Sequence, residues 1–167
     1  MLDREGTLQL DATLTDLFPD VPFDPAIEAD QVTVRHLLSH TAGIDNGPIG
    51  FRAAYTGEHT PARMLELLAR TIVEEDSPRG TFEYTNVGYN ILSLRLDELD
   101  GGPWQTLLAD RLFTPLGMTH TTAYVSETSS WHPAMPYTGA PDGSAERISL
   151  VKYDDTMQAA GGMISTA

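Results

Sequence analysis

The chain has 167 residues, of which 41% are hydrophobic, enough for one globular domain or part of one. Its 24 acidic residues outnumber 10 lysines and arginines, so the formal net charge is -14 at pH 7. Because such a surface repels phosphate backbones and anionic lipids, we expect neither a nucleic-acid nor a membrane partner. The absence of cysteine excludes disulfides, thiolate metal sites and a cysteine nucleophile.

The two ends of the sequence look like pieces of longer elements. "MLDREG" resembles the last turn of a helix, stopped by Gly6 at the left-handed position that follows a helix end. At the other end, Ser165 and Thr166 stand where a helix N-cap is expected, yet no helix follows. We therefore expect residues 1–167 to form a single partial domain.

Between these ends the pattern of apolar residues is mostly helical. Four helices are predicted in chain order, with candidate caps or prolines at their starts: residues 33–43, 60–76, 86–101 and 103–114. Their expected apolar faces are Val34, Leu37 and Leu38; Leu65, Leu68 and Ile72; Ile91, Leu92, Leu94 and Leu99; and Leu107, Leu108, Leu112 and Phe113. From about residue 119 the chain is predicted to be irregular, because "WHPAMPYTGAPDGSAE" is rich in Pro, Gly and small polar residues.

The acid-rich composition also bears on the source and location of the protein. A chain with Lys152 as its only lysine is typical of proteins that stay soluble in concentrated salt, so we interpret the composition as salt adaptation. The alternative is an ordinary acidic cytoplasmic protein. No apolar run approaches the length of about 18 residues that spans a membrane, and "MLDREGTLQL" lacks the features of a signal peptide. Because the start of the sequence looks cut, we leave the location open, with the cytoplasm as the default expectation.

Two patterns that could carry chemistry have simpler explanations. His36 and His40 have the spacing at which two imidazoles on a helix can share a metal, but no third ligand is evident. We interpret one as a packing residue and the other as a favourable charge near a helix end, and we expect no metal and no cofactor. Ser149 and Lys152 form a Ser-x-x-Lys pattern, which is a nucleophile-and-base motif in some hydrolases. We interpret it as a coincidence.

The segment "FEYTNVGYN" holds a stronger candidate. If residues 82–86 are extended, Tyr84 and Asn86 lie on the same face, so that a phenol and a carboxamide can converge on one ligand. The alternative is a half-buried Tyr84 and an Asn86 that only caps the helix beginning at Val87.

Four segments in order resemble the class C beta-lactamase-related family of serine hydrolases: "VTVRHLLSHTAGI", "PRGTFEYTNVGYNILSLRLDELDGG", "LFTPLGM" and "AAGGMISTA". The resemblance implies an antiparallel sheet, built from both chain ends, packed against an inserted helical region. Because the matching segments cover mainly the helical region of this α/β beta-lactamase/transpeptidase-like fold, we expect a mainly α chain with a few short strands. Most of the antiparallel sheet would be missing, which would expose an apolar helical face and allow association through it.

The same resemblance implies a site. Tyr84 matches the tyrosine that acts as general base and acid in the family, and Asn86 matches the asparagine that binds the substrate amide. The nucleophilic serine with its lysine, and a late pocket strand, would lie outside residues 1–167. We therefore expect a serine hydrolase of small-molecule esters, amides or beta-lactams, of which this chain is an incomplete and inactive piece. The alternative is a non-catalytic remnant, or half of a split protein that acts only through association.

Overall fold

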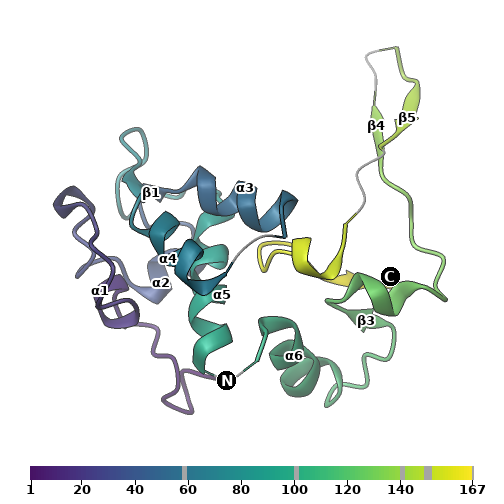
Figure 1. The fold of residues 1–167 in the computed structure, drawn as a ribbon, viewed down its shortest axis with the longest axis horizontal. Helices are drawn as coiled ribbons and strands as arrows, with labels where there is room; N and C mark the ends of the chain where they lie inside the picture. The colour runs from purple at the N-terminus through teal and green to yellow at the C-terminus, as the bar shows by residue number, and fades with distance from the viewer. Residues whose placement is uncertain (58–59, 100–101, 140–141, 149–151, 167) are drawn as a thin grey trace.

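A computed structural model describes residues 1–57, 60–99, 102–139, 142–148 and 152–166. As expected, the chain is mainly helical with a few short strands (Figure 1). The α-helices are α1 (Leu14–Leu17), α2 (Val34–Leu38), α3 (Gly47–Tyr55), α4 (Pro61–Leu68), α5 (Val87–Leu99) and α6 (Trp104–Leu108). The strands are β1 (Ile44–Asp45), β2 (Ile72–Val73), β3 (Thr121–Thr122), β4 (Tyr137–Gly139), β5 (Ala145–Arg147) and β6 (Ile164–Ser165).

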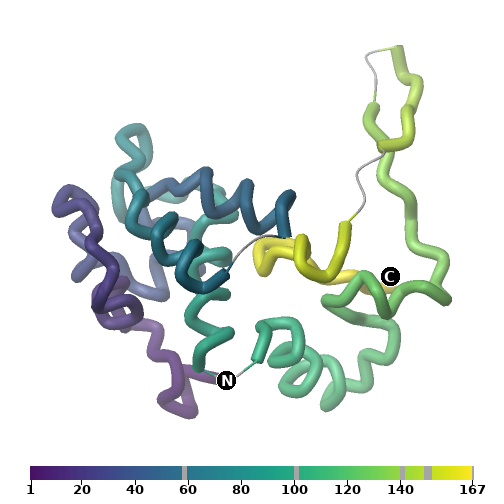
Figure 2. The backbone as a smooth tube through the Cα atoms, in the orientation of Figure 1, coloured from purple at the N-terminus to yellow at the C-terminus, as the bar shows by residue number. Residues whose placement is uncertain are grey.

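The strands pair antiparallel in twos: β1 with β2, β3 with β6, and β4 with β5. Helices α1 to α5 gather on one side of the molecule, with the long α5 running through the group (Figure 1). The chain trace shows the last segment returning between α3 and β3, while the β4–β5 hairpin projects away from the rest (Figure 2). None of the helices in the described ranges is long and apolar enough to cross a membrane.

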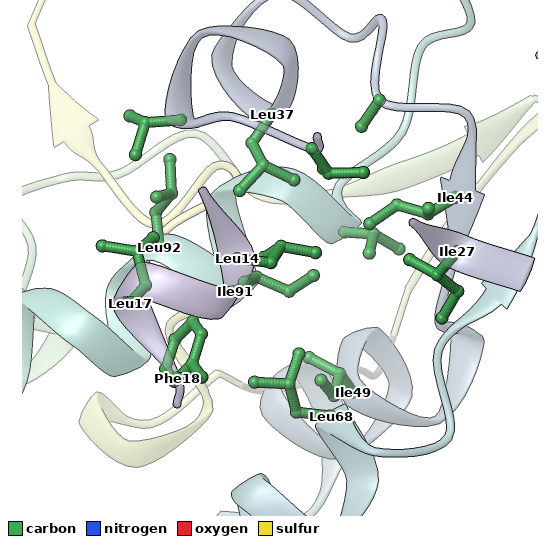
Figure 3. Close-up of a cluster of buried hydrophobic side chains, with 14 of the residues drawn as sticks. Leu14, Leu17, Phe18, Ile27, Leu37, Ile44, Ile49, Leu68, Ile91 and Leu92 are labelled. Atoms are coloured by element: carbon green, nitrogen blue, oxygen red, sulfur yellow. The ribbon is translucent and has the colours of Figure 1, made fainter. Parts of the chain in front are cut away.

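The main hydrophobic core lies among helices α1 to α5. Its five largest fully buried side chains come from segments far apart in the sequence and converge on α5 (Figure 3): Leu14, Leu37, Ile49, Leu68 and Ile91. Helices α2 and α5 approach closely at Gly88, where an added Cβ would lie 2.4 Å from the backbone oxygen of Leu37. A glycine at this point therefore sets the position of α5, and with it the segment that carries Tyr84 and Asn86.

Helix α2 begins as predicted but ends early. Thr33 is its N-cap, with its side chain accepting from the backbone N–H of His36, while the His36 ring accepts from the N–H of Thr33. The expected end at Gly43 is wrong, because the helix ends at Leu38 and His40 takes up a left-handed conformation with φ 57°. His36 and His40 are therefore not on one helical face.

Helices α4 and α6 also depart from prediction in part. Thr60 and Pro61 start α4 as expected, but Met64 and Leu67 are buried with Leu68, and Ile72 is 59% exposed in β2. The expected stripe fails because the helix ends at Leu68, before Ile72 can share its face. Residues Ala109–Phe113 continue α6 as a π-helix, which leaves Leu112 exposed. The predicted end of α5 at Gly101 lies outside the described residues.

The C-terminal third is more regular than the sequence suggested. The Pro-rich and Gly-rich stretch after residue 130 contains the β4–β5 hairpin, which leaves all of its strand residues exposed. Ser165 lies in β6 and pairs with Thr121 of β3. Strand β6 forms by pairing with the distant β3, which local composition does not report, whereas β4 and β5 are neighbours in the sequence.

The first residues do form the end of a helical turn, as predicted. Gly6 has φ 73°, its N–H donates to the Asp3 oxygen, and the Thr7 N–H donates to the Leu2 oxygen at 2.9 Å. This pair of bonds is the Schellman arrangement that closes helix C-termini.

Replacing the buried Asn46 by alanine is expected to lower the free energy of unfolding by about 1–3 kcal/mol. The Asn46 amide donates to the Leu67 oxygen at 2.8 Å and to the Thr71 hydroxyl at 3.0 Å, and its oxygen accepts from the Ile49 N–H. The substitution removes these three buried hydrogen bonds, and urea denaturation should detect the loss. The exposed Asn86→Ala variant is the control, and an equal loss in both variants would contradict the expectation.

Candidate active site

Tyr84 and Asn86 meet at the start of α5, as the sequence predicted. The Tyr84 hydroxyl donates to the Asn86 Oδ1 at 3.3 Å, and both side chains are exposed, Tyr84 at 67%. The interpretation of Tyr84 as half-buried is therefore wrong. The Asn86 oxygen is used by the phenol, and the first helical N–H, of Val87, donates instead to the Thr85 hydroxyl. The phenol and carboxamide are thus presented together to solvent.

The pair lines a small cavity of about 280 Å³. His40 and Tyr89 complete one wall, and residues 159–161 form the other. The sequence did not single out these last residues as part of a site. Their only signal was the short "AAGGMISTA" segment, which indicated family membership without a role.

The second wall of the cavity is held by contacts from α5 and α6. The buried Asn90 donates through its Nδ2 to the Gln158 Oε1 at 3.0 Å, and the Asn90 Oδ1 has no hydrogen-bond partner among the residues that the structure describes. The Trp104 ring packs where a Cβ on Gly162 would lie 3.0 Å away. These two contacts fix the loop that faces Tyr84 and Asn86.

The electrostatic surroundings of Tyr84 are acidic. A neighbouring cavity of about 220 Å³ is lined by Tyr84 and His40 together with Asp45, Glu74 and Glu83. Apart from His40, the side chains of this lining that can carry a charge near neutral pH are these three carboxylates, and no lysine or arginine lines it.

Lys152, the only lysine of the chain, does not line the Tyr84 cavity. Its Nζ donates to the backbone oxygen of Ala54 and lies 4.8 Å from the centre of the Tyr55 ring. Burial lowers the pKa of Lys152, because a partly desolvated ammonium is less stable. Ser149, its partner in the Ser-x-x-Lys pattern, lies outside the described residues.

The two histidines have separate contacts. The His36 ring belongs to the cap of α2, whereas the His40 ring contacts Tyr84 and Tyr89. Within the ranges that the structure describes, no three His, Asp or Glu side chains are grouped in a way that could hold a metal ion.

An apolar groove of about 610 Å³ adjoins the cavity and shares Tyr89 and Ala159 with it. Leucines of α2, α5 and α6 line much of it, and Met1 and Leu2 lie along it as well. An apolar groove of this kind on a helical face is typical of a surface that another segment or partner covers.

The beta-lactamase family model matches residues 1–167, the whole of the chain. The chain belongs to the beta-lactamase-related family of serine hydrolases. Its similarity to penicillin-binding protein 4 of Amycolatopsis lactamdurans is 34% identity over 141 residues, which is 80% of this chain and 34% of that relative. The resemblance read from the sequence is thereby confirmed.

Solved structures of other proteins are also similar to this chain. It matches the D-amino acid amidase of Ochrobactrum anthropi SV3, complexed with L-phenylalanine amide, with a TM-score of 0.73 and 30% identity, over 99% of this chain and 46% of the amidase. It also shares the fold of an octameric penicillin-binding protein homologue from Pyrococcus abyssi, with a TM-score of 0.68 and 23% identity, over 99% of this chain and 38% of the homologue. The chain therefore spans less than half the length of these proteins.

Proposed function

We propose that residues 1–167 are part of a serine hydrolase that cleaves a small ester, amide or beta-lactam by acyl transfer. The observation that carries the proposal is the hydrogen-bonded pair of Tyr84 and Asn86 at the edge of an open cavity. The membership of the beta-lactamase family supports it, as do relatives named as an amidase and a penicillin-binding protein.

In this mechanism Tyr84 moves the proton and Asn86 orients the substrate. The ionised phenol takes the proton of the attacking serine hydroxyl as the serine–acyl bond forms, and it then gives that proton to the departing oxygen or nitrogen. Water attacks the acyl-enzyme in the second half of the reaction, with Tyr84 again taking and returning a proton. When Tyr84 is protonated its hydroxyl donates to the Asn86 Oδ1, and in either state the Asn86 NH2 group can donate to a substrate carbonyl.

The nucleophile of this mechanism is proposed to lie outside residues 1–167, with most of the antiparallel sheet. The position of Lys152 supports this view. This lysine, the only one in the sequence, donates to the backbone oxygen of Ala54 and does not line the Tyr84 cavity. Among the described residues, no lysine or arginine lines either of the two cavities beside Tyr84. On this proposal residues 1–167 are a single partial domain, and without the rest it is inactive.

The apolar groove supports a proposal that further chain covers it in the complete enzyme. Leu38 and Leu112, both on its lining, are exposed at 37% and 38%. Burial of apolar surface stabilises a fold by about 25 cal/mol per Å², so an uncovered groove favours association. The second candidate function is that of a non-catalytic remnant, or half of a split protein, which acts only by associating with a partner through this groove.

The test uses a fluorophosphonate probe, which labels activated serines, and a chromogenic ester. We expect the 167-residue chain neither to be labelled nor to hydrolyse the ester above buffer. The open reading frame extended in both directions should do both, and it should contain a Ser-x-x-Lys shortly upstream of Met1. A stop codon in place of that motif favours the non-catalytic candidate. Stoichiometric labelling of the isolated chain would contradict the external nucleophile and direct attention to Ser149.

A further inference from the structure

His40 contacts the segment that carries Tyr84 in more than one way. Its backbone oxygen accepts from the Glu83 N–H at 2.9 Å, and its ring Nδ1 accepts from the Thr85 N–H at 3.4 Å. The residues on both sides of Tyr84 are therefore tied to His40. Because Nδ1 accepts a hydrogen bond, the proton of the neutral ring is on Nε2.

The His40 ring also packs directly on the phenol. The ring centroids of His40 and Tyr84 are 4.8 Å apart with an interplanar angle of 39°, and the Tyr89 ring lies 5.5 Å from His40 on α5. Phe82 contacts the same imidazole edge to face at 5.8 Å. Three aromatic rings therefore contact the imidazole, at centroid distances typical of favourable ring pairs.

The backbone of His40 is in an uncommon conformation. Its φ of 57° places it in the left-handed region, which residues other than glycine rarely adopt and which persists only where the surroundings hold it. Asparagine, aspartate and histidine are the side chains that tolerate this region best. The conformation lets the chain turn out of α2 and bring the ring under Tyr84.

We propose that His40 is a positioning residue that fixes the direction of the Tyr84 phenol in the cavity. The inference rests on the proposed function, since the direction of the phenol matters to catalysis only if Tyr84 transfers the proton. A positioning role explains why the half-buried His40 lines both cavities beside Tyr84. His40 belongs to no metal site in the described part of the chain. His40 acts through Tyr84 and need not touch the substrate.

The test follows Tyr84 itself in the isolated 167-residue chain, independently of hydrolysis. The six tyrosines are labelled with ¹³C in the ring, and the Tyr84 resonance is assigned from its loss in Tyr84→Phe. In His40→Ala we expect this resonance to move toward that of an unstacked tyrosine. We also expect the Thr85 amide to exchange with solvent about five- to tenfold faster, because it loses its acceptor. His132→Ala, which removes an exposed histidine, is the control and should change neither signal.

Two conservative variants separate the ring contact from the hydrogen bond. His40→Asn tolerates the left-handed backbone and can accept from Thr85, so the amide should stay protected while the Tyr84 resonance still moves. His40→Phe keeps a ring but has no acceptor, so the amide should exchange faster while the resonance moves less. If His40→Ala does not fold, His40→Asn carries the test. A Tyr84 resonance that is unchanged in folded His40→Asn overturns the proposal.

The complete enzyme distinguishes this inference from the proposed function. There, His40→Asn should lower kcat for the chromogenic ester while KM changes little, because the substrate still binds to Asn86. If Tyr84→Phe leaves kcat unchanged, the proposed function fails, although the ring contact can still be confirmed by the resonance. If Tyr84→Phe abolishes activity and His40→Asn leaves both the resonance and kcat unchanged, only the role of His40 fails.

Discussion

Tyr84→Phe is expected to lower kcat/KM by about 100- to 10,000-fold in the complete enzyme, which is the usual contribution of a positioned general acid or base. The variant removes the only group of the side chain that can carry a proton and keeps the ring that packs on His40. The loss should fall mainly on kcat, because the phenol is proposed to act in the transition state. Steady-state hydrolysis of the chromogenic ester measures it.

The matched control for this prediction is Tyr137→Phe. Tyr137 is 58% exposed in β4, on the hairpin that projects from the body, and it does not line the Tyr84 cavity. Its replacement should leave kcat/KM within about twofold, as is usual for an exposed site away from function. Equal rates for Tyr84→Phe and the unmodified enzyme would remove Tyr84 from the mechanism.

Ile91→Ala should lower the free energy of unfolding by about 2–5 kcal/mol, the range for removing a large buried aliphatic side chain. Ile91 is fully buried in α5, at the centre of the core that α1 to α4 share (Figure 3). The substitution creates a cavity, and because the packing around Ile91 is dense, the neighbouring side chains can fill it only in part. Because domains are stable by about 5–15 kcal/mol, this loss is a large part of the total.

Ile72→Ala provides the comparison, because it makes the same chemical change at a side chain that is 59% exposed in β2. We expect a loss of less than about 1 kcal/mol there, since little packing is removed. Urea denaturation followed by circular dichroism measures both variants. Equal losses at the two positions would show that the helices do not share the core described here.

The predicted helix starts succeeded because they depend on residues close in sequence. Thr33 and Thr60 cap α2 and α4 through hydrogen bonds to backbone groups three residues ahead, so neighbouring letters suffice to predict them. The ends failed more often. The end of α2 depends on His40, whose left-handed backbone is held by contacts to residues 82–89, and a local pattern does not contain that information.

By itself, the sequence determined the family and indicated that Tyr84 and Asn86 can converge if their segment is extended, and the structure joins the two side chains by a hydrogen bond. Only the tertiary structure decided what surrounds that pair. It placed His40 beneath the phenol and joined Asn90 to Gln158, which brings residues 159–161 opposite the pair. Contacts between positions so distant in the chain arise from the packing of α2, α5 and the C-terminal segment, and no local periodicity encodes them.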